Sequence, residues 1–135
     1  MEPAPVSTSR RGRSILVVDD DPKLADILKR ALERRGHSCA VAESGDQALW
    51  AVTAEQPDGI VLDVMIPHPS GLEVCRHLRT EGYDGAIVVI SARSNPDDRA
   101  AATRAGADEF LAKPFALAEL IAAVDAALTR PPSRA

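Results

Sequence analysis

Five short apolar runs, each followed by a helical pattern, constrain the fold of this 135-residue chain more than any other feature. The runs cover about residues 14–18, 37–42, 59–63, 86–90 and 109–112. Apolar residues then recur at helical spacing near residues 22–35, 44–56, 72–78, 95–105 and 117–128. Alternating strands and helices predict an α/β fold. Because crossovers between parallel strands are right-handed, we expect a doubly wound, five-stranded parallel sheet with helices on both faces.

Local signals mark the helix ends. Asp21 before Pro22 predicts an N-cap followed by a first-turn proline. Ser44 and Gln47 have the spacing of a capping box. The run 86–90 is apolar without interruption, which is typical of a strand buried on both faces, whereas 37–42 is weaker and predicts an edge strand.

Charged and hydroxyl side chains follow four of the five runs at the point where each strand should end. They are Asp19, Asp20 and Asp21 after the first run, Asp63 after the third, Ser91 after the fourth and Lys113 after the fifth. The carboxyl ends of parallel strands meet at one edge of a sheet, where ligands of such folds bind. Clustered carboxylates repel one another, so this edge predicts a divalent cation, and the lysine predicts an anion.

These residue types suit phosphoryl transfer. Mg²⁺ prefers hard oxygen ligands such as the carboxylates of Asp19 and Asp20. A carboxylate such as Asp63 can act as a nucleophile toward a phosphoryl group. The ammonium of Lys113 and the hydroxyl of Ser91 can hold the phosphoryl oxygens. The sequence therefore predicts a phosphoryl-accepting switch.

Five ordered motifs carry a family resemblance. They are Leu16-Val17-Val18-Asp19-Asp20-Asp21-Pro22, Leu62-Asp63-Val64-Met65-Ile66-Pro67 with Gly71, Ile90-Ser91-Ala92-Arg93, Gly106-Ala107-Asp108 and Lys113-Pro114-Phe115. Over residues 14–130 the chain resembles a bacterial two-component response-regulator receiver domain of the chemotaxis-regulator-like kind. The resemblance implies a flavodoxin-like sheet with strand order 2-1-3-4-5. Residues 1–13 and 131–135 are predicted to be disordered tails because they have little to bury.

The resemblance also implies roles for single residues. Asp63 would accept the phosphoryl group from a sensor histidine kinase or a phosphotransfer protein. The metal, Mg²⁺ or Mn²⁺, would be held by Asp19, Asp20, Asp63 and the backbone carbonyl of Met65. Ser91 would bind the phosphoryl group and Lys113 would bridge to it, from a cis bond to Pro114.

In the same family Ser91 and an aromatic residue, here Phe110, form a switch. The switch would alter the surface made by the fourth helix (from Pro96), the fifth strand and the fifth helix, which would then bind a partner differently. Some positions depart from the family pattern. Ala116 stands where a polar N-cap is usual, and Pro69 and Ser70 make the loop after Asp63 a local variant. Arg104, Ala123 and Asp125 do not match the charge pairs through which DNA-binding relatives dimerise.

Two other functions remain open from the residues. The chain would be a phosphorylation-independent protein-binding module of the same fold if Asp63 and the metal did not matter. A metal-dependent phosphatase with an aspartate nucleophile usually has a second Asp two residues later, where this chain has Met65. We therefore expect no enzyme beyond one that catalyses its own phosphoryl transfer and dephosphorylation.

Composition limits the kinds of partner and the cellular location that we expect for this chain. A net charge of −4 does not favour direct nucleic-acid binding. No apolar stretch approaches the roughly 20 residues that span a bilayer, and no signal-peptide pattern is present. Cys39 and Cys75 are expected as free thiols of a cytoplasmic protein. The few residues after Arg130 cannot form an output domain, so we expect a separate downstream protein or a missing output domain as partner.

Overall fold

The computed structural model describes residues 12–130, so the predicted tails lie outside the described residues except for Gly12 and Arg13. One sheet of five parallel strands has the order β2-β1-β3-β4-β5, which confirms the predicted fold and strand order. The elements are β1 (Ser14–Val18), α2 (Pro22–Arg34), β2 (Ser38–Ala42), α3 (Gly45–Glu55), β3 (Gly59–Asp63), α4 (Gly71–Thr80), β4 (Ala86–Ser91), α5 (Pro96–Ala105), β5 (Glu109–Ala112) and α6 (Leu117–Thr129).

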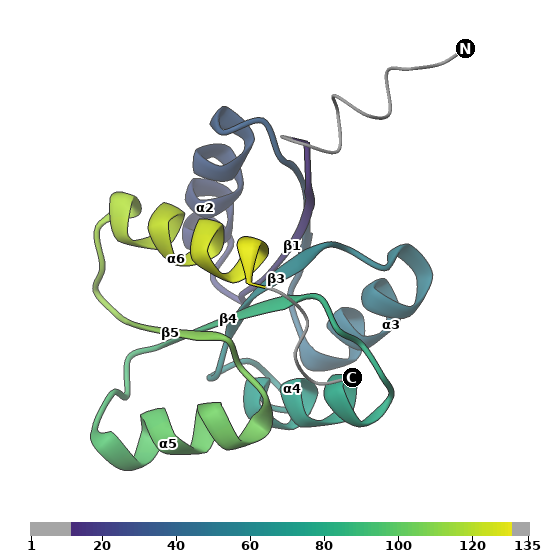
Figure 1. The fold of residues 1–135 in the computed structure, drawn as a ribbon, viewed down its shortest axis with the longest axis vertical. Helices are drawn as coiled ribbons and strands as arrows, with labels where there is room; N and C mark the ends of the chain where they lie inside the picture. The colour runs from purple at the N-terminus through teal and green to yellow at the C-terminus, as the bar shows by residue number, and fades with distance from the viewer. Residues whose placement is uncertain (1–11, 131–135) are drawn as a thin grey trace.

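Helices cover both faces of the sheet, as the alternating pattern predicts (Figure 1). Helices α2 and α6 pack on one face, and α3, α4 and α5 pack on the other. Successive strand residues point to opposite faces, so Ile15 and Val17 join one core cluster while Leu16 and Val18 join the other. Strands β3 and β4 are buried along their whole length because they lie at the centre of this sandwich.

The register of the strands aligns their carboxyl ends. Val18 pairs with Leu62, so Asp19 follows β1 at the level of Asp63. Asp63 pairs with Ile90, which places Ser91 one residue further along the next strand. Ser91 in turn pairs with Ala112, the residue before Lys113. The polar side chains singled out in the sequence therefore gather at one edge of the sheet.

The helix starts agree with the sequence in part. The Asp21 carboxylate accepts from the N–H of Lys23 at 3.0 Å, as an N-cap should. Ser44 accepts from the N–H of Gln47 at 3.2 Å. However, the Gln47 side chain accepts from Glu43 rather than from Ser44, so the capping box predicted here forms only in half.

Two further helix starts use a glutamate. Ser70 and Glu73 form a complete capping box at α4, which sequence analysis missed because the preceding Pro69 made the segment resemble a loop. Ala116 offers no side-chain acceptor, as expected, but the Glu119 carboxylate accepts from its backbone N–H at 2.9 Å. The start of α6 is therefore half capped rather than bare.

Some residues on the predicted apolar stripes are not covered. Ile27 is 48% exposed and Leu117 is 40% exposed. Each stripe is wider than the strip of helix surface that contacts the sheet, so residues at its border stay open to solvent. Asp125 pairs with Arg35 at 3.3 Å. Within residues 12–130 there is no helix with the length and apolarity needed to cross a bilayer.

The largely covered side chain of Arg79 links α4 to the amino ends of β4 and β5. The Arg79 guanidinium of α4 donates to the carbonyls of Tyr83, Gly85 and Gly106 and pairs with Asp108 at 3.0 Å. Asp108 also accepts from the backbone N–H of Ile87 at 2.9 Å. These bonds tie α4 to the first residues of β4 and to the turn before β5, which fixes the height of β5 in the sheet.

Candidate functional site

Two aspartates are buried where β1 and β3 end. Asp19 is 1% exposed and Asp63 is 3% exposed. In each case one carboxylate oxygen accepts a hydrogen bond from the backbone N–H two residues later, Asp21 at 2.9 Å and Met65 at 2.9 Å. These two hydrogen bonds fix the orientation of each carboxylate, and its second oxygen, Oδ2, is left for other partners at the edge of the sheet.

Lys113 lies directly opposite these carboxylates. Its Nζ is 2.9 Å from Oδ2 of Asp63 and 3.7 Å from Oδ2 of Asp19. Its backbone N–H donates to the carbonyl of Ser91 at 2.8 Å, so β4 sets the height of the lysine. The Lys113–Pro114 bond is cis, as the family resemblance implies, and the His68–Pro69 bond is cis as well.

A metal ion fits the acidic cluster. One oxygen each of Asp19, Asp20 and Asp63 lie within 4.8 Å of one another. Oδ2 of Asp19 is buried and accepts no hydrogen bond from any of the described residues. A buried carboxylate oxygen without a donor is costly, and the Lys113 ammonium at 3.7 Å is beyond hydrogen-bond distance, so a bound metal ion could satisfy this oxygen. Hard carboxylate oxygens are the donors that Mg²⁺ prefers.

Charges within the cluster act on one another. Burial raises the pKa of Asp19, and the neighbouring charges of Asp63 and Asp20 add to this rise, while the Asp21 N–H and Lys113 oppose it. Burial lowers the pKa of Lys113, but its hydrogen bond to Asp63 and the charges of Asp63 and Asp19 raise it on balance. The lysine is therefore held as an ammonium beside Oδ2 of Asp63.

Ser91 and Phe110 lie together beside this cluster. Ser91 is 1% exposed, and its hydroxyl oxygen accepts from the backbone N–H of Arg93 at 2.9 Å. Both residues line a small cavity of about 90 Å³, together with Val64 and Leu72. The structure thus brings Asp19, Asp20, Asp63 and Lys113 into direct proximity, and it turns the Ser91 hydroxyl toward Arg93.

The sequence analysis missed a cation on the aromatic ring. The guanidinium of Arg99, on α5, lies 4.7 Å from the centre of the Phe110 ring. No spacing rule connects residues 99 and 110, because the contact depends on how α5 packs against β5. Such a contact stabilises the present position of the ring.

Gly71, the first residue of α4, packs directly on the carboxyl end of β3. Its N–H donates to the carbonyl of Val64 at 3.0 Å. A Cβ atom added at Gly71 would collide with the backbone carbonyl of Asp63 and with the Val64 Cα. The glycine that follows the Asp63 motif therefore allows α4 to approach the backbone of Asp63 closely.

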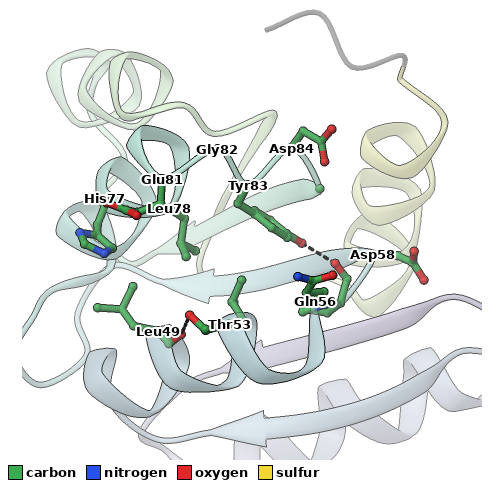
Figure 2. A pocket seen from close by; sticks show the side chains of 13 residues that line it. Leu49, Thr53, Gln56, Asp58, His77, Leu78, Glu81, Gly82, Tyr83 and Asp84 are labelled. Atoms are coloured by element: carbon green, nitrogen blue, oxygen red, sulfur yellow. Dashed lines mark hydrogen bonds between the residues drawn. The ribbon is translucent and has the colours of Figure 1, made fainter. Parts of the chain in front are cut away.

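A larger cavity of about 600 Å³ opens at the opposite edge of the sheet, between the ends of α3 and α4 (Figure 2). Tyr83 closes one side and donates from its hydroxyl to the carbonyl of Pro57 at 2.7 Å. Figure 2 shows the carboxylates of Asp58 and Asp84 directed away from this cavity. It therefore gathers no set of charges comparable to the acidic cluster.

Comparisons with known proteins agree with this site. A family profile described as the response regulator receiver domain matches residues 15–125. Response regulator MprA of Mycolicibacterium vanbaalenii is 48% identical over 116 residues, which are 86% of this chain and 50% of that protein. Response regulator MprA of Mycobacterium leprae is likewise 48% identical over 86% of this chain. The chain spans about half the length of these curated relatives.

Solved structures have the same fold. The Francisella response regulator 1452 receiver domain has a TM-score of 0.84 and 31% identity, over 88% of this chain and 98% of that one. The beryllofluoride-activated N-terminal receiver domain of Klebsiella pneumoniae RstA has a TM-score of 0.81 and 27% identity, over 87% of this chain and 99% of that one. With the acidic edge, these matches show that the chain belongs to the response regulator receiver domains, which are signalling modules of two-component systems rather than classical enzymes.

Proposed function

We propose that Asp63 accepts a phosphoryl group from a phosphohistidine of a sensor histidine kinase or a phosphotransfer protein. The observation that carries this proposal is the contact of 2.9 Å between the buried Asp63 carboxylate and the Lys113 ammonium. A buried acceptor oxygen beside a fixed cation meets the main needs of phosphoryl transfer, which are positioning and charge stabilisation.

The transfer itself exchanges one bond for another. An Asp63 oxygen attacks phosphorus, the phosphorus–nitrogen bond of the donor breaks, and its electron pair leaves with the imidazole, which takes up a proton. Lys113 is already within hydrogen-bond distance of Asp63 and can shift to an oxygen of the transferred group. Its raised pKa keeps it charged while it does so.

A divalent cation, Mg²⁺ or Mn²⁺, would be held by Asp19, Asp20, Asp63 and the backbone carbonyl of Met65. When bound, it would neutralise charge that develops on the phosphoryl oxygens. The unbonded Oδ2 of Asp19 supports its presence. Asp20 is exposed at the rim and stands where a metal keeps some of its water ligands.

Phosphorylation would then act on the switch pair. The Ser91 hydroxyl accepts from Arg93 and keeps its own proton to donate to a phosphoryl oxygen. Turning toward Asp63, it would leave room beside Phe110 in the shared cavity. The ring would move inward and alter the surface formed by α5, β5 and α6, to which a downstream protein or an output domain binds. The predicted cytoplasmic location stays a prediction.

The test is incubation with acetyl phosphate and Mg²⁺, followed by intact-mass measurement. The expected result is a mass gain of one phosphoryl group in the wild type and none in Asp63→Asn. Asp46→Asn is the matched control, because Asp46 is an exposed acidic residue in the first turn of α3. It should gain the same mass as the wild type.

A second set of measurements separates this proposal from the binding-module alternative. Beryllofluoride, which activated the RstA receiver domain, should bind the wild type with Mg²⁺ and not Asp63→Asn. Two results together would establish the phosphorylation-independent module instead. The wild type would gain no more mass than Asp63→Asn, and neither Asp63→Asn nor a chelator would change the binding of a partner.

A further inference from the structure

Helix α3 leaves one corner of the sheet uncovered. Residues Ala40 and Ala42 of β2 point to the same face, and Ala42 is 2% exposed beneath α3. Ala40, two residues earlier, is exposed. A groove of about 300 Å³ lies over this corner, between Trp50 and Ala51 of α3 and the first residues of β1 and β2, including Ser14.

The groove carries an unusual aromatic residue. Trp50, the one tryptophan of the sequence, is 70% exposed. Val41, also 39% exposed, borders the same groove on β2. Most residues that line the groove are apolar, and an apolar hollow at the surface indicates a contact rather than a solvated face. Strand β2 is the edge of the sheet, so nothing in the described part of the chain flanks it on that side.

We propose that the groove is filled by the N-terminal segment of the same chain, through residues Pro3–Val6. The first reason is reach. Ser14 itself lines the groove, so the segment joins the domain at its rim. Glu55 also lines it near Ser14, and Trp50 lies about 7.5 Å further along the helix. Residues 7–13 span up to about 23 Å when extended, which is ample for this distance.

The second reason is chemistry. Pro3, Ala4, Pro5 and Val6 form the apolar part of a segment whose other residues are polar or charged, except for the first methionine. Proline-rich chains favour the extended polyproline II conformation and dock into grooves lined by aromatic residues. Trp50 supplies such a ring. The basic Arg10 and Arg11 would then pass the exposed carboxylate of Glu55, so the charges match as well.

Tethering makes even a weak contact effective. A short linker gives the segment an effective concentration on the order of millimolar at the groove. A contact of only millimolar affinity would therefore fill the groove about half of the time. The segment has too few apolar residues to form a core of its own. Docking in the groove would bury these residues against the domain instead.

Fluorescence of the full chain tests the proposal directly, because Trp50 is its one tryptophan. The variant Pro3→Ser/Pro5→Ser/Val6→Ser should show a red-shifted emission maximum and stronger quenching by acrylamide than the wild type. The matched control Ser7→Ala/Ser9→Ala keeps the apolar residues and should behave as the wild type. The domain keeps all contacts of residues 12–130 in both variants.

Two outcomes would overturn the proposal. Identical emission and quenching in the wild type and the triple variant would show that the segment does not cover Trp50. Protection of Trp50 that grows with protein concentration and persists in the triple variant would assign the groove to a second copy of the chain. Protection that is independent of concentration and lost in the triple variant supports docking within one chain.

Discussion

Asp19 and Asp63 are buried as deeply as core leucines, yet both carry charge at the edge of the sheet. Three clustered carboxylates and the Lys113 ammonium give a formal charge of −3 + 1 = −2. One divalent cation cancels this charge. Under the proposed function, a transferred phosphoryl group would add negative charge again, about −1.5 to −2, which the lysine and a bound metal would share.

Mg²⁺ should therefore stabilise the folded protein by binding to it. At a concentration about ten times its Kd, the cation should add about 1.4 kcal/mol to the free energy of unfolding. Urea unfolding in Mg²⁺ and in EDTA measures this difference. Asp20→Asn should keep the fold and lose most of the effect, because Asp20 is exposed and offers a metal-binding oxygen.

The control for this prediction is Asp46→Asn, which removes an exposed carboxylate away from the cluster. It should retain the full difference between Mg²⁺ and EDTA. If Asp20→Asn and the wild type showed the same difference in unfolding free energy between Mg²⁺ and EDTA, Mg²⁺ would act through general screening of charge. The assignment of the metal site to Asp19, Asp20 and Asp63 would then be wrong.

Neither cysteine forms a disulfide within residues 12–130, as the sequence predicts, and both should be unreactive as nucleophiles. Burial, with the charge of Glu33, raises the pKa of Cys39 from 9.0 to about 11. The thiolate reacts, so at pH 8 Cys39 should react about 100 times more slowly than an ordinary thiol. Its rate with an aromatic disulfide reagent should rise about tenfold per pH unit up to pH 10. A pH-independent rate would contradict the assigned pKa.

Among the helices, α4 and α6 differ in one hydroxyl group. At α4 both Ser70 and Glu73 cap the first turn. At α6, Glu119 reaches back to Ala116, but Ala116 has no side-chain oxygen, and the N–H of Glu119 donates to the Ala116 backbone carbonyl at 2.9 Å instead. The backbone of Ala116 is extended (φ −81°, ψ 148°), as an N-cap requires.

Ala116→Ser should therefore stabilise the protein by at most about 0.5 kcal/mol, because the serine hydroxyl would add only a second acceptor for an N–H that already has one. Ser70→Ala should destabilise it by about 1 kcal/mol. The midpoints of urea unfolding measure both. Ala122→Ser, an exposed site in the middle of α6, is the control and should not stabilise. A loss of stability in Ala116→Ser would show that α6 begins elsewhere.

For the whole molecule, the question is how Asp63 and the surface of α5, β5 and α6 are coupled. The guanidinium of Arg99 on the Phe110 ring opposes any inward turn of that ring. Under the proposed function, Arg99→Ala should favour the activated state. With a contact of 0.5–1 kcal/mol removed, beryllofluoride with Mg²⁺ should bind about two- to fivefold more tightly.

Titration of beryllofluoride, followed by NMR signals of β5, measures this change. Arg104→Ala is the matched control, because Arg104 lies on the same helix and is exposed. It should leave the binding unchanged. Equal affinities of Arg99→Ala and wild type would show that the ring and the acceptor are not coupled through this contact.

The sequence predicted what depends on neighbours in the chain or on strand order. The apolar runs ending at Asp63 and Ser91 are strands, and parallel pairing brings Asp19, Asp63 and Lys113 together. It could not predict which way the Ser91 hydroxyl turns, since Arg93 N–H competes for it locally.

Sequence patterns could also not predict contacts between elements that lie far apart in the chain. The pairing of Arg79 with Asp108 and the stacking of Arg99 on Phe110 depend on how helices sit on the sheet. The 70% exposure of Trp50 likewise depends on which side of α3 faces the sheet, since Ala48 and Val52 are the buried residues next to it. Periodicity marks a helix face as apolar but does not say how much of that face the sheet reaches.

The missing side chain at Gly71 has a mechanical consequence. Backbone meets backbone where α4 begins, so no flexible group lies between that helix and the Asp63 carbonyl to absorb displacement. A displacement of the Asp63 peptide should therefore pass directly to the first turn of α4, because no side chain at this contact can take it up. Close backbone packing thus makes the start of α4 part of the immediate surroundings of Asp63.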